Sequence, residues 1–320
     1  MFIKSRTKSF LKFMKKHLSI LFFALISING ISQEELTVPI DSLPFDAIIS
    51  STFGGKRIKY YGDIKLNLNQ AFFENWISGG ESSFSGFCNL NYHFNYSDRK
   101  GWVWDSYVTY SVGGNKISNN KLKKADDRFE LNTQLGKQIN NYWNYSVNLN
   151  LRTQLFPGYR YYSIDNVTKQ EKQSQFFSPA IFQLGLGWYY KQNKDTWINL
   201  SPITSRLIIV NSAYTRDLAE GKKYFGVKRG ENYELYLGAA INGFKKFILM
   251  QNVTMESKFN IYTNFLKEMK NVDFELNTAI KMKVNNRLSS NFIIHLLYDD
   301  DLISDLQIRQ LFGVGFDIYL

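Results

Sequence analysis

Hydrophobic and polar residues alternate one by one over long stretches of this chain. In WNYSVNLNLRTQL, residues 143–155, every odd-numbered position is apolar or threonine and every even-numbered position is polar. The same alternation recurs in residues 87–96, 129–139 and 272–284. Successive side chains of a β-strand point to opposite faces, so a period of two predicts strands with one apolar and one polar face.

Turn signals divide the remainder of the chain into similar pieces. Short polar segments such as SDRKG (97–101), QNKD (192–195) and GFKK (243–246) predict tight turns between consecutive strands. Together these signals predict twelve strands, at residues 64–76, 83–96, 102–113, 127–139, 142–156, 176–191, 196–210, 232–243, 247–262, 272–284, 288–298 and 306–320.

The predicted connections alternate between short turns and longer loops. An even number of strands with this alternation is typical of outer-membrane β-barrels, whose short turns are periplasmic. Tryptophan and tyrosine also gather near strand ends, as in the girdles of such barrels. A soluble β-sandwich would alternate too, but its strands are typically only about 5–6 residues long. We therefore predict a single all-β domain, a twelve-stranded antiparallel transmembrane barrel.

Two regions depart from the alternating pattern. Pro202 interrupts the strand at 196–210, and proline cannot donate to a strand ladder, so we expect a bulge there or a strand that starts after it. Residues 33–62 lack clear alternation and are interpreted as a periplasmic lead-in or a segment within the lumen. The barrel itself is then predicted over residues 63–320.

The N-terminus has the features of an export signal. Residues 1–17 carry six Lys or Arg and no acidic residue, an apolar run follows at 18–28, and small residues Gly30 and Ser32 come next. This order predicts a secretory signal peptide, residues 1–32, cleaved before Gln33. The alternative is an uncleaved helical anchor. Such an anchor needs about 20 apolar residues, and the run at 18–28 is shorter than that.

Removal of this segment changes the net charge of the chain. The full chain of 320 residues carries a net charge of +11, but the mature chain has 33 basic against 28 acidic residues, a net charge of +5. Nucleic acid is therefore not an expected partner, and no nucleic-acid-binding motif appears. The hydrophobic content of 44% excludes a disordered chain. The lone Cys88 excludes internal disulfides and cysteine-based zinc sites.

Several motifs resemble those of a known family. The segment containing Asn75, Trp76, Gly79, Gly80, Glu81 and Ser83 is similar to an Asn-Trp-x-x-Gly-Gly-Glu-x-Ser pattern of an uncharacterised outer-membrane β-barrel family, a domain of unknown function found in the Bacteroidota. Further matches are FPGYR (156–160), FFSPAIFQLGLGW (176–188), LSPITSRL (200–207) and LLYDDD (296–301). The resemblance covers about residues 64–320 and implies fold and location, but no activity or catalytic residues. We call Trp76, Gly79, Gly80 and Glu81 the signature loop. Its glycine pair could let a ligand come close to the backbone, but we favour a tight turn between two strands.

Charged residues fall on the polar, lumen-facing side of the predicted strands. Both signs occur on neighbouring strands, which permits a selective constriction or an internal salt-bridge network that plugs the barrel. We favour the plug, because charges in a narrow lumen must pair. The predicted network is Asp105, Glu130, Arg152, Glu256, Lys258, Asp273, Glu275, Lys281 and Lys283.

Other candidate sites have weaker signals. His93 and His295 could serve an outer-membrane lipase-type hydrolase, but no G-x-S-x-G motif accompanies them. Asp299–Asp301 with Asp305 could bind Ca²⁺, although their spacing is not that of an EF-hand and a solvated turn is favoured. Basic residues in the longer loops could face lipopolysaccharide phosphates or simply keep the loops soluble. They are Lys116, Lys121, Lys123, Lys124, Lys222, Lys223, Lys228 and Arg229.

The sequence therefore predicts an outer-membrane barrel that is either a narrow pore or a structural component of an envelope complex. We expect that the protein is not an enzyme and that it binds no cofactor or metal. The alternative function is that of a lipase-type hydrolase. Expected partners are outer-membrane lipids, lipopolysaccharide and the barrel-assembly machinery. Substrate, specific protein partners and oligomeric state are beyond what the sequence indicates.

Overall fold

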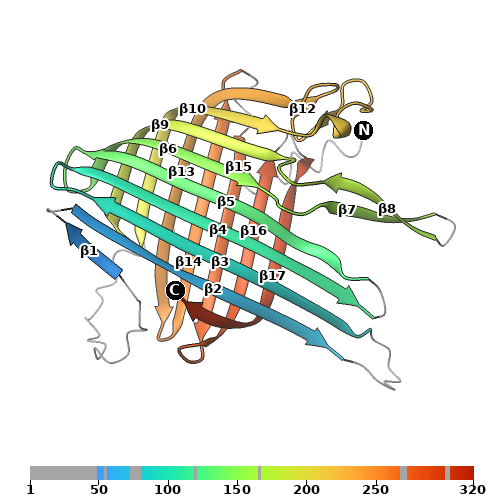
Figure 1. Ribbon diagram of the computed structural model, residues 1–320, viewed down its shortest axis with the longest axis horizontal. Helices are drawn as coiled ribbons and strands as arrows, with labels where there is room; N and C mark the ends of the chain where they lie inside the picture. Colours follow the sequence, from blue (N-terminus) through green and yellow to red (C-terminus); the bar gives the residue numbers. More distant parts are fainter. Residues whose placement is uncertain are drawn as a thin grey trace, which may run out of the picture. The chain divides into compact units, whose positions relative to one another are not determined.

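The computed structural model describes residues 49–53, 56–72, 81–118, 121–164, 167–266, 272–299 and 303–320. Twelve long strands form the wall of a barrel (Figure 1). They are β2 (Lys56–Ala71), β3 (Ser83–Ser97), β4 (Trp102–Ile117), β5 (Lys123–Gln138), β6 (Trp143–Thr153), β9 (Ala180–Asn193), β10 (Thr196–Ile209), β13 (Tyr233–Met250), β14 (Val253–Asn264), β15 (Val272–Lys283), β16 (Leu288–Asp299) and β17 (Ile303–Tyr319).

The wall closes on itself. Every neighbouring pair is antiparallel, and β2 pairs with β3 on one side and with β17 on the other. The β2–β17 ladder runs from Asp63↔Tyr319 to Leu68↔Val314. The predicted closed, twelve-stranded antiparallel barrel is thus confirmed. Closure leaves no open edge in the wall, which is the requirement for strands that span a bilayer.

Five shorter strands lie outside the wall circuit. β1 (Ile49–Phe53) pairs with the start of β2. β7 (Gly158–Ile164) and β8 (Val167–Ser174) form a hairpin between β6 and β9. The connection from β10 to β13 holds the 3₁₀ helix η3 (Ser212–Tyr214) and the short strands β11 (Lys223–Tyr224) and β12 (Val227–Lys228).

Several predicted boundaries were wrong. The first wall strand starts at Lys56 rather than 64, so the end of the predicted lead-in 33–62 belongs to a strand, while residues 33–48 lie outside the described residues. The GFKK turn does not exist, because β13 continues through it to Met250. The turn lies instead at Gln251–Asn252, where Asn252 takes a left-handed φ of 63° that asparagine tolerates better than most residues. The β7–β8 hairpin was missed because it lies in a polar loop without an apolar face.

The bulge expected at Pro202 is present. The register of β10 shifts between Leu200 and Ile203 against β9, and between Ser201 and Thr204 against β13. Thr204 Oγ1 donates to the Ser201 carbonyl, 2.9 Å away, and so satisfies a group that the ladder leaves free. Gly187 of β9 makes room for the bulge, since a Cβ there would lie 1.9 Å from the Leu200 carbonyl oxygen.

Short turns at one end of the barrel share one local device. In four of the five, an Asp or Asn side chain accepts hydrogen bonds from backbone N–H groups further along the turn. The acceptors are Asp98, Asn140, Asn193 and Asn285. Such Asx turns compete well with the strand ladder and end it sharply. The opposite end carries the longer connections, including the β7–β8 hairpin and the β10–β13 loop.

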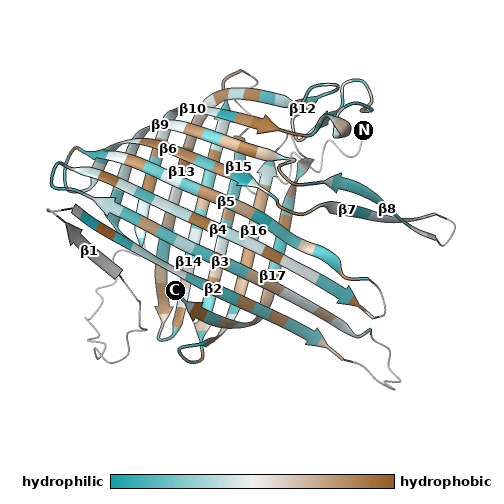
Figure 2. Ribbon diagram, viewed as in Figure 1, coloured by the Kyte–Doolittle hydropathy of each residue, from teal (hydrophilic) through white to brown (hydrophobic). Residues whose placement is uncertain are grey.

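The two faces of the wall differ in chemistry. On β17, Val314, Phe316 and Ile318 are about half exposed on the outside, while Gly315 and Asp317 are buried on the inside. Figure 2 shows the resulting brown and teal alternation along the strands. Aromatic residues such as Tyr145 stand exposed near the strand ends, at headgroup level. No helix among the described residues is long and apolar enough to cross a membrane.

This combination identifies the environment of the barrel. An apolar exterior around a polar interior is stable only where hydrocarbon surrounds the wall, and closed barrels of this kind occur in outer membranes. The protein is an outer-membrane barrel.

Candidate functional site

Glu275 stands at the centre of a charged cluster inside the lumen. Its Oε1 accepts from Arg128 Nη2 at 2.8 Å, and its Oε2 accepts from Arg152 Nη2 at 2.5 Å. His295 Nε2 lies 2.8 Å from the same Oε1. Only 9% of the Glu275 side chain is exposed, so these three partners replace the water that a carboxylate normally binds.

The contacts of Glu275 cross the barrel. Around the wall, β15 and β5 are six strands apart in a circuit of twelve, so Glu275 and Arg128 come from directly opposite sides. Arg128 Nη2 also donates to Glu130 Oε2 at 2.9 Å, and Asn132 supports that carboxylate at 3.0 Å. The guanidinium group of Arg128 therefore bridges two carboxylates from opposite walls.

Two more arginines hold the lumen at the same end. Arg206 pairs with Asp273 and stacks on the Tyr262 ring, with its guanidinium carbon 3.6 Å from the ring centroid. Arg309 binds Asp126 with both terminal nitrogens, at 2.8 and 2.9 Å. All these residues lie in the strand halves next to the long loops. We call Arg128, Arg152, Arg206 and Arg309, with their carboxylate partners and His295, the arginine level.

A loop packs inside the barrel next to part of the arginine level. Val227, in the β10–β13 loop, is fully buried against the inward-facing Ile208, Tyr236 and Tyr262. The Tyr236 hydroxyl donates to the Gly226 carbonyl at 3.1 Å and fixes the loop in that position. The loop therefore packs against the inner side of β10, β13 and β14.

Lysines dominate the remainder of the lumen, from mid-barrel to the short turns. Each of four lysines pairs with one carboxylate, and the closest pair is Lys191 Nζ with Asp105 Oδ2 at 2.5 Å. The other pairs are Lys281–Asp317 at 2.7 Å, Lys246–Glu256 at 3.0 Å and Lys65–Asp63 at 3.5 Å. With Lys258, these residues form what we call the lysine level.

Lys258 is held by an aromatic stack. The rings of Tyr61 and His93 lie 4.5 Å apart and nearly parallel, and His93 lies 4.3 Å from Tyr107. Lys258 Nζ reaches the far side of Tyr107, 3.5 Å from its ring centroid. Because β14 and β4 are also six strands apart, this cation–π contact is a second bridge across the lumen.

Uncharged side chains fill the gaps near the β9–β10 wall. Asn148 Nδ2 donates to Ser201 Oγ at 2.7 Å, and Ser146 Oγ donates to Asn199 Oδ1 at 3.1 Å. These side chains are almost completely buried although they face the lumen. The polar face of the wall is therefore packed against itself rather than lining open water.

The structure places the predicted network residues as follows. Glu130, Arg152, Asp273 and Glu275 meet in the arginine level, whereas Asp105, Glu256, Lys258 and Lys281 lie in the lysine level. Lys283 lies at the end of β15, beside the short turn. In the signature loop, Trp76, Gly79 and Gly80 lie outside the described residues, and Glu81 is exposed.

Sequence reasoning missed half of the partners. The network also contains Arg128, Arg206, Arg309, Asp126, Asp317, Lys191, Lys246, Lys65 and Asp63. Strand alternation already placed Arg128 on the same face as Glu130, so this signal was available. Arg206 was harder to assign, because the Pro202 bulge shifts the alternation in its strand. Arg309 lies within the predicted strand 306–320, on the same face as Asp317, so its signal was available too.

The two histidines considered as candidates lie in different parts of the lumen. Within the described residues, His93 contacts aromatic rings, and His295 contacts Glu275 and Arg128. Of the predicted acidic loop, Asp300 and Asp301 lie outside the described residues, while Asp299 faces Arg206 at 4.0 Å. No group of three or more His, Cys, Asp or Glu in the described part of the chain has the arrangement of a metal site.

One family model matches part of the chain. A model of the family described as protein of unknown function, DUF3078, matches residues 68–159, from β2 to the start of β7. No curated protein matches the chain.

Among solved structures, the COG4313 outer membrane channel from Pseudomonas putida F1 is 7% identical, with a TM-score of 0.35, over 84% of this chain and 96% of that one. The translocator domain of the autotransporter NalP from Neisseria meningitidis is 8% identical, with a TM-score of 0.34, over 83% and 88%. The NanC porin is 8% identical, with a TM-score of 0.30, over 81% and 97%. The family model of unknown function thus matches part of this chain, and the site is described from its own geometry.

Proposed function

We propose that this protein is an occluded outer-membrane barrel that serves as a non-enzymatic component of the cell envelope. The observation that carries the proposal is Glu275, which binds Arg128 and Arg152 from the opposite side of the lumen. A freely diffusing solute would have to displace these ion pairs and the loop residue Val227 behind them. Such a barrel does not act as an open diffusion pore.

A second candidate is a narrow pore that opens on a signal. It is favoured by the nature of the closure, which consists mainly of side-chain ion pairs. Breaking those pairs leaves the backbone hydrogen bonds of the wall intact, so the lumen can open without unfolding the barrel. Charged groups that line a narrow passage also select among ions.

Planar-bilayer conductance separates these possibilities. We expect purified wild-type protein to give no steady single-channel steps, and steady steps would contradict occlusion. The variant Arg128→Ala/Glu275→Ala removes the central bridge, and we expect it to conduct if the closure is a gate. Silence of this variant would eliminate the gated pore and favour the structural role.

A matched control tests whether any loss of charge produces conductance. Lys246→Ala/Glu256→Ala also removes one ion pair, but this pair lies near the short turns and is more than one-third exposed. We expect this control to remain silent. Conductance equal to that of the central variant would show a general weakening of the barrel rather than the opening of a gate.

The proposal extends to origin and partners. The motifs around Trp76 and Phe156 resemble a Bacteroidota family, which supports an envelope protein from that group. Insertion by the barrel-assembly machinery and contact with outer-membrane lipids would follow from the fold. Affinity capture of the tagged protein from native outer membranes, followed by mass spectrometry, tests for a stable envelope partner. Recovery of the barrel alone would contradict a role in an envelope complex.

A further inference from the structure

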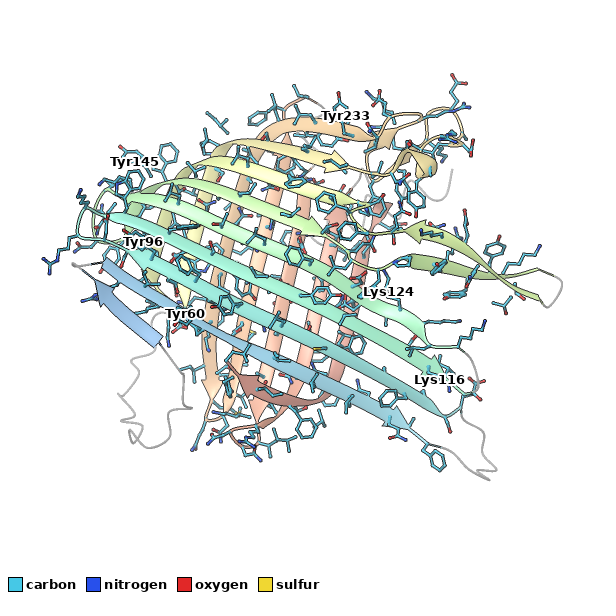
Figure 3. All side chains as sticks on the ribbon, in the orientation of Figure 1. Tyr60, Tyr96, Lys116, Lys124, Tyr145 and Tyr233 are labelled. Carbon is cyan, nitrogen blue, oxygen red and sulfur yellow. The ribbon has the colours of Figure 1, made fainter. Side chains whose placement is uncertain are left out.

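The β7–β8 hairpin and the adjacent β4–β5 turn form an exposed surface rich in cations and aromatic rings. Residues 116–124 and 158–174 contain seven Lys or Arg and only two acidic residues. Tyr159, Tyr161 and Tyr162 are each about 40% exposed on the hairpin. Figure 3 shows Lys116 and Lys124 at the same end of the barrel as this hairpin.

The cations and the rings share one face of the hairpin. Tyr159 and Tyr161 are two residues apart on β7, so their side chains leave the same face about 6.6 Å apart. Lys172 stands opposite Tyr159 in the β8 register and therefore belongs to this face. Lys123 of β5 adds its ammonium group 4.6 Å from the Tyr161 ring centroid.

The base of the hairpin is fixed to the barrel. Lys124 Nζ donates to the Phe156 carbonyl at 2.8 Å and to Gln154 Oε1 at 3.0 Å. On the other strand, the Tyr224 hydroxyl donates to the Gln173 carbonyl. Burial raises the pKa of Tyr224, so this hydroxyl keeps its proton and remains a donor. The surface is thus held in place before any ligand arrives, which lowers the entropic cost of binding.

Apolar side chains lie next to the cations at the same rim. Phe84, Leu122, Phe156 and Phe176 are between 46% and 66% exposed, at or next to the strand ends that face the long loops. A ligand that contacts both groups must combine acyl chains with an anionic head. Sugar rings in that head could also stack on the exposed tyrosines, whose faces are apolar.

We propose that this surface, comprising the cations Lys123 and Lys172 with Tyr159 and Tyr161, binds the phosphorylated saccharide of lipopolysaccharide from the surrounding leaflet. The cations neutralise the phosphates, the tyrosines contact the sugar rings and the apolar rim contacts the acyl chains. Charge complementarity and the adjacent apolar rim favour this glycolipid over a soluble acidic polysaccharide, which would have no use for the rim. The inference is independent of whether the lumen opens.

Binding of a deep-rough lipopolysaccharide to the purified full-length protein in detergent tests the proposal, with native mass spectrometry as the readout. We expect Lys123→Ala/Lys172→Ala to bind about thirtyfold more weakly, because each cation near an anionic headgroup contributes about 1 kcal/mol. Tyr161→Leu keeps every charge, and we expect a smaller loss of about threefold.

The matched control removes two cations from the other large loop at the same end. Lys222→Ala/Arg229→Ala should bind like the wild type. An equal loss in the control and the hairpin variant would overturn the proposal, and so would unchanged binding by the hairpin variant. Undiminished binding of a dephosphorylated lipopolysaccharide would also overturn it, since that result assigns recognition to the acyl chains alone. A soluble acidic polysaccharide that competes fully would show that the rim plays no part.

Discussion

The arginine level and the lysine level of the lumen solve the same problem in different ways. Arg128 bridges two carboxylates, Glu130 and Glu275, that come from opposite walls. Lys281 and Lys191 instead pair with one carboxylate each, two and three strands away around the wall. A planar guanidinium presents several donors in fixed directions, whereas an ammonium group acts as a point charge. The comparison suggests that arginine closes the lumen across its width, while lysine mainly balances charge along the wall.

The largest expected effect comes from removing the hub of the arginine level. Glu275→Ala leaves Arg128, Arg152 and His295 facing one another without their shared carboxylate. Breaking a buried ion pair in this way costs about 3 kcal/mol or more. We expect a clear fall in the guanidinium midpoint of the barrel reconstituted in lipid vesicles.

Glu275→Gln is the matched control, because it keeps the shape and an acceptor oxygen but not the charge. It should fall between the wild type and Glu275→Ala. If all three proteins unfold at the same midpoint, the cluster contributes no stability and the arginine level is only a space-filling feature.

A smaller effect should follow from changing the geometry of an arginine while keeping its charge. Arg128→Lys retains the cation but loses the fork that reaches Glu130 and Glu275 together. We expect a loss of about 1 kcal/mol in the free energy of unfolding, measured in the same vesicles.

The reverse exchange in the lysine level sharpens this prediction. The role of Lys191 depends only on its charge. Lys191→Arg should therefore change the free energy of unfolding by less than Arg128→Lys does. Equal losses at the two positions would remove the distinction between the levels.

The smallest effect is expected for the cation–π bridge of the lysine level. Lys258→Met removes the charge above Tyr107 but keeps a side chain of similar length. Contacts of this kind contribute about 0.5–1 kcal/mol where water has partial access. The unfolding midpoint should therefore shift only slightly. A shift as large as that of Glu275→Ala would mean that the contact between Lys258 and Tyr107 matters as much as the Glu275 cluster.

Lys246→Met provides the control for this last substitution. Lys246 pairs with Glu256 near the short turns, where both side chains are more than one-third exposed. Exposed pairs contribute little, so we expect almost no change in the midpoint.

Strand alternation was enough to identify the barrel and the inward face. It placed Glu130, Arg152 and Glu275 in the lumen, because a period of two assigns each residue to a face without reference to other strands. Polar turn residues such as Asp98 and Asn140 also marked the short turns correctly. The prediction of a turn at GFKK was wrong, because a lysine on a barrel strand cannot be distinguished in the sequence from a lysine in a turn.

Strand alternation could not predict which charged residues pair with one another. The partners Arg128 and Glu275 are 147 residues apart along the chain, and only the closure of the barrel brings β5 and β15 to opposite sides. The inward fold of Val227 likewise depends on how a loop packs against three wall strands. The sequence by itself therefore determined a membrane barrel and its two faces, since these follow from local periodicity. Only the tertiary structure decided which charges pair across the lumen, because this pairing depends on distances across the barrel that no local pattern encodes.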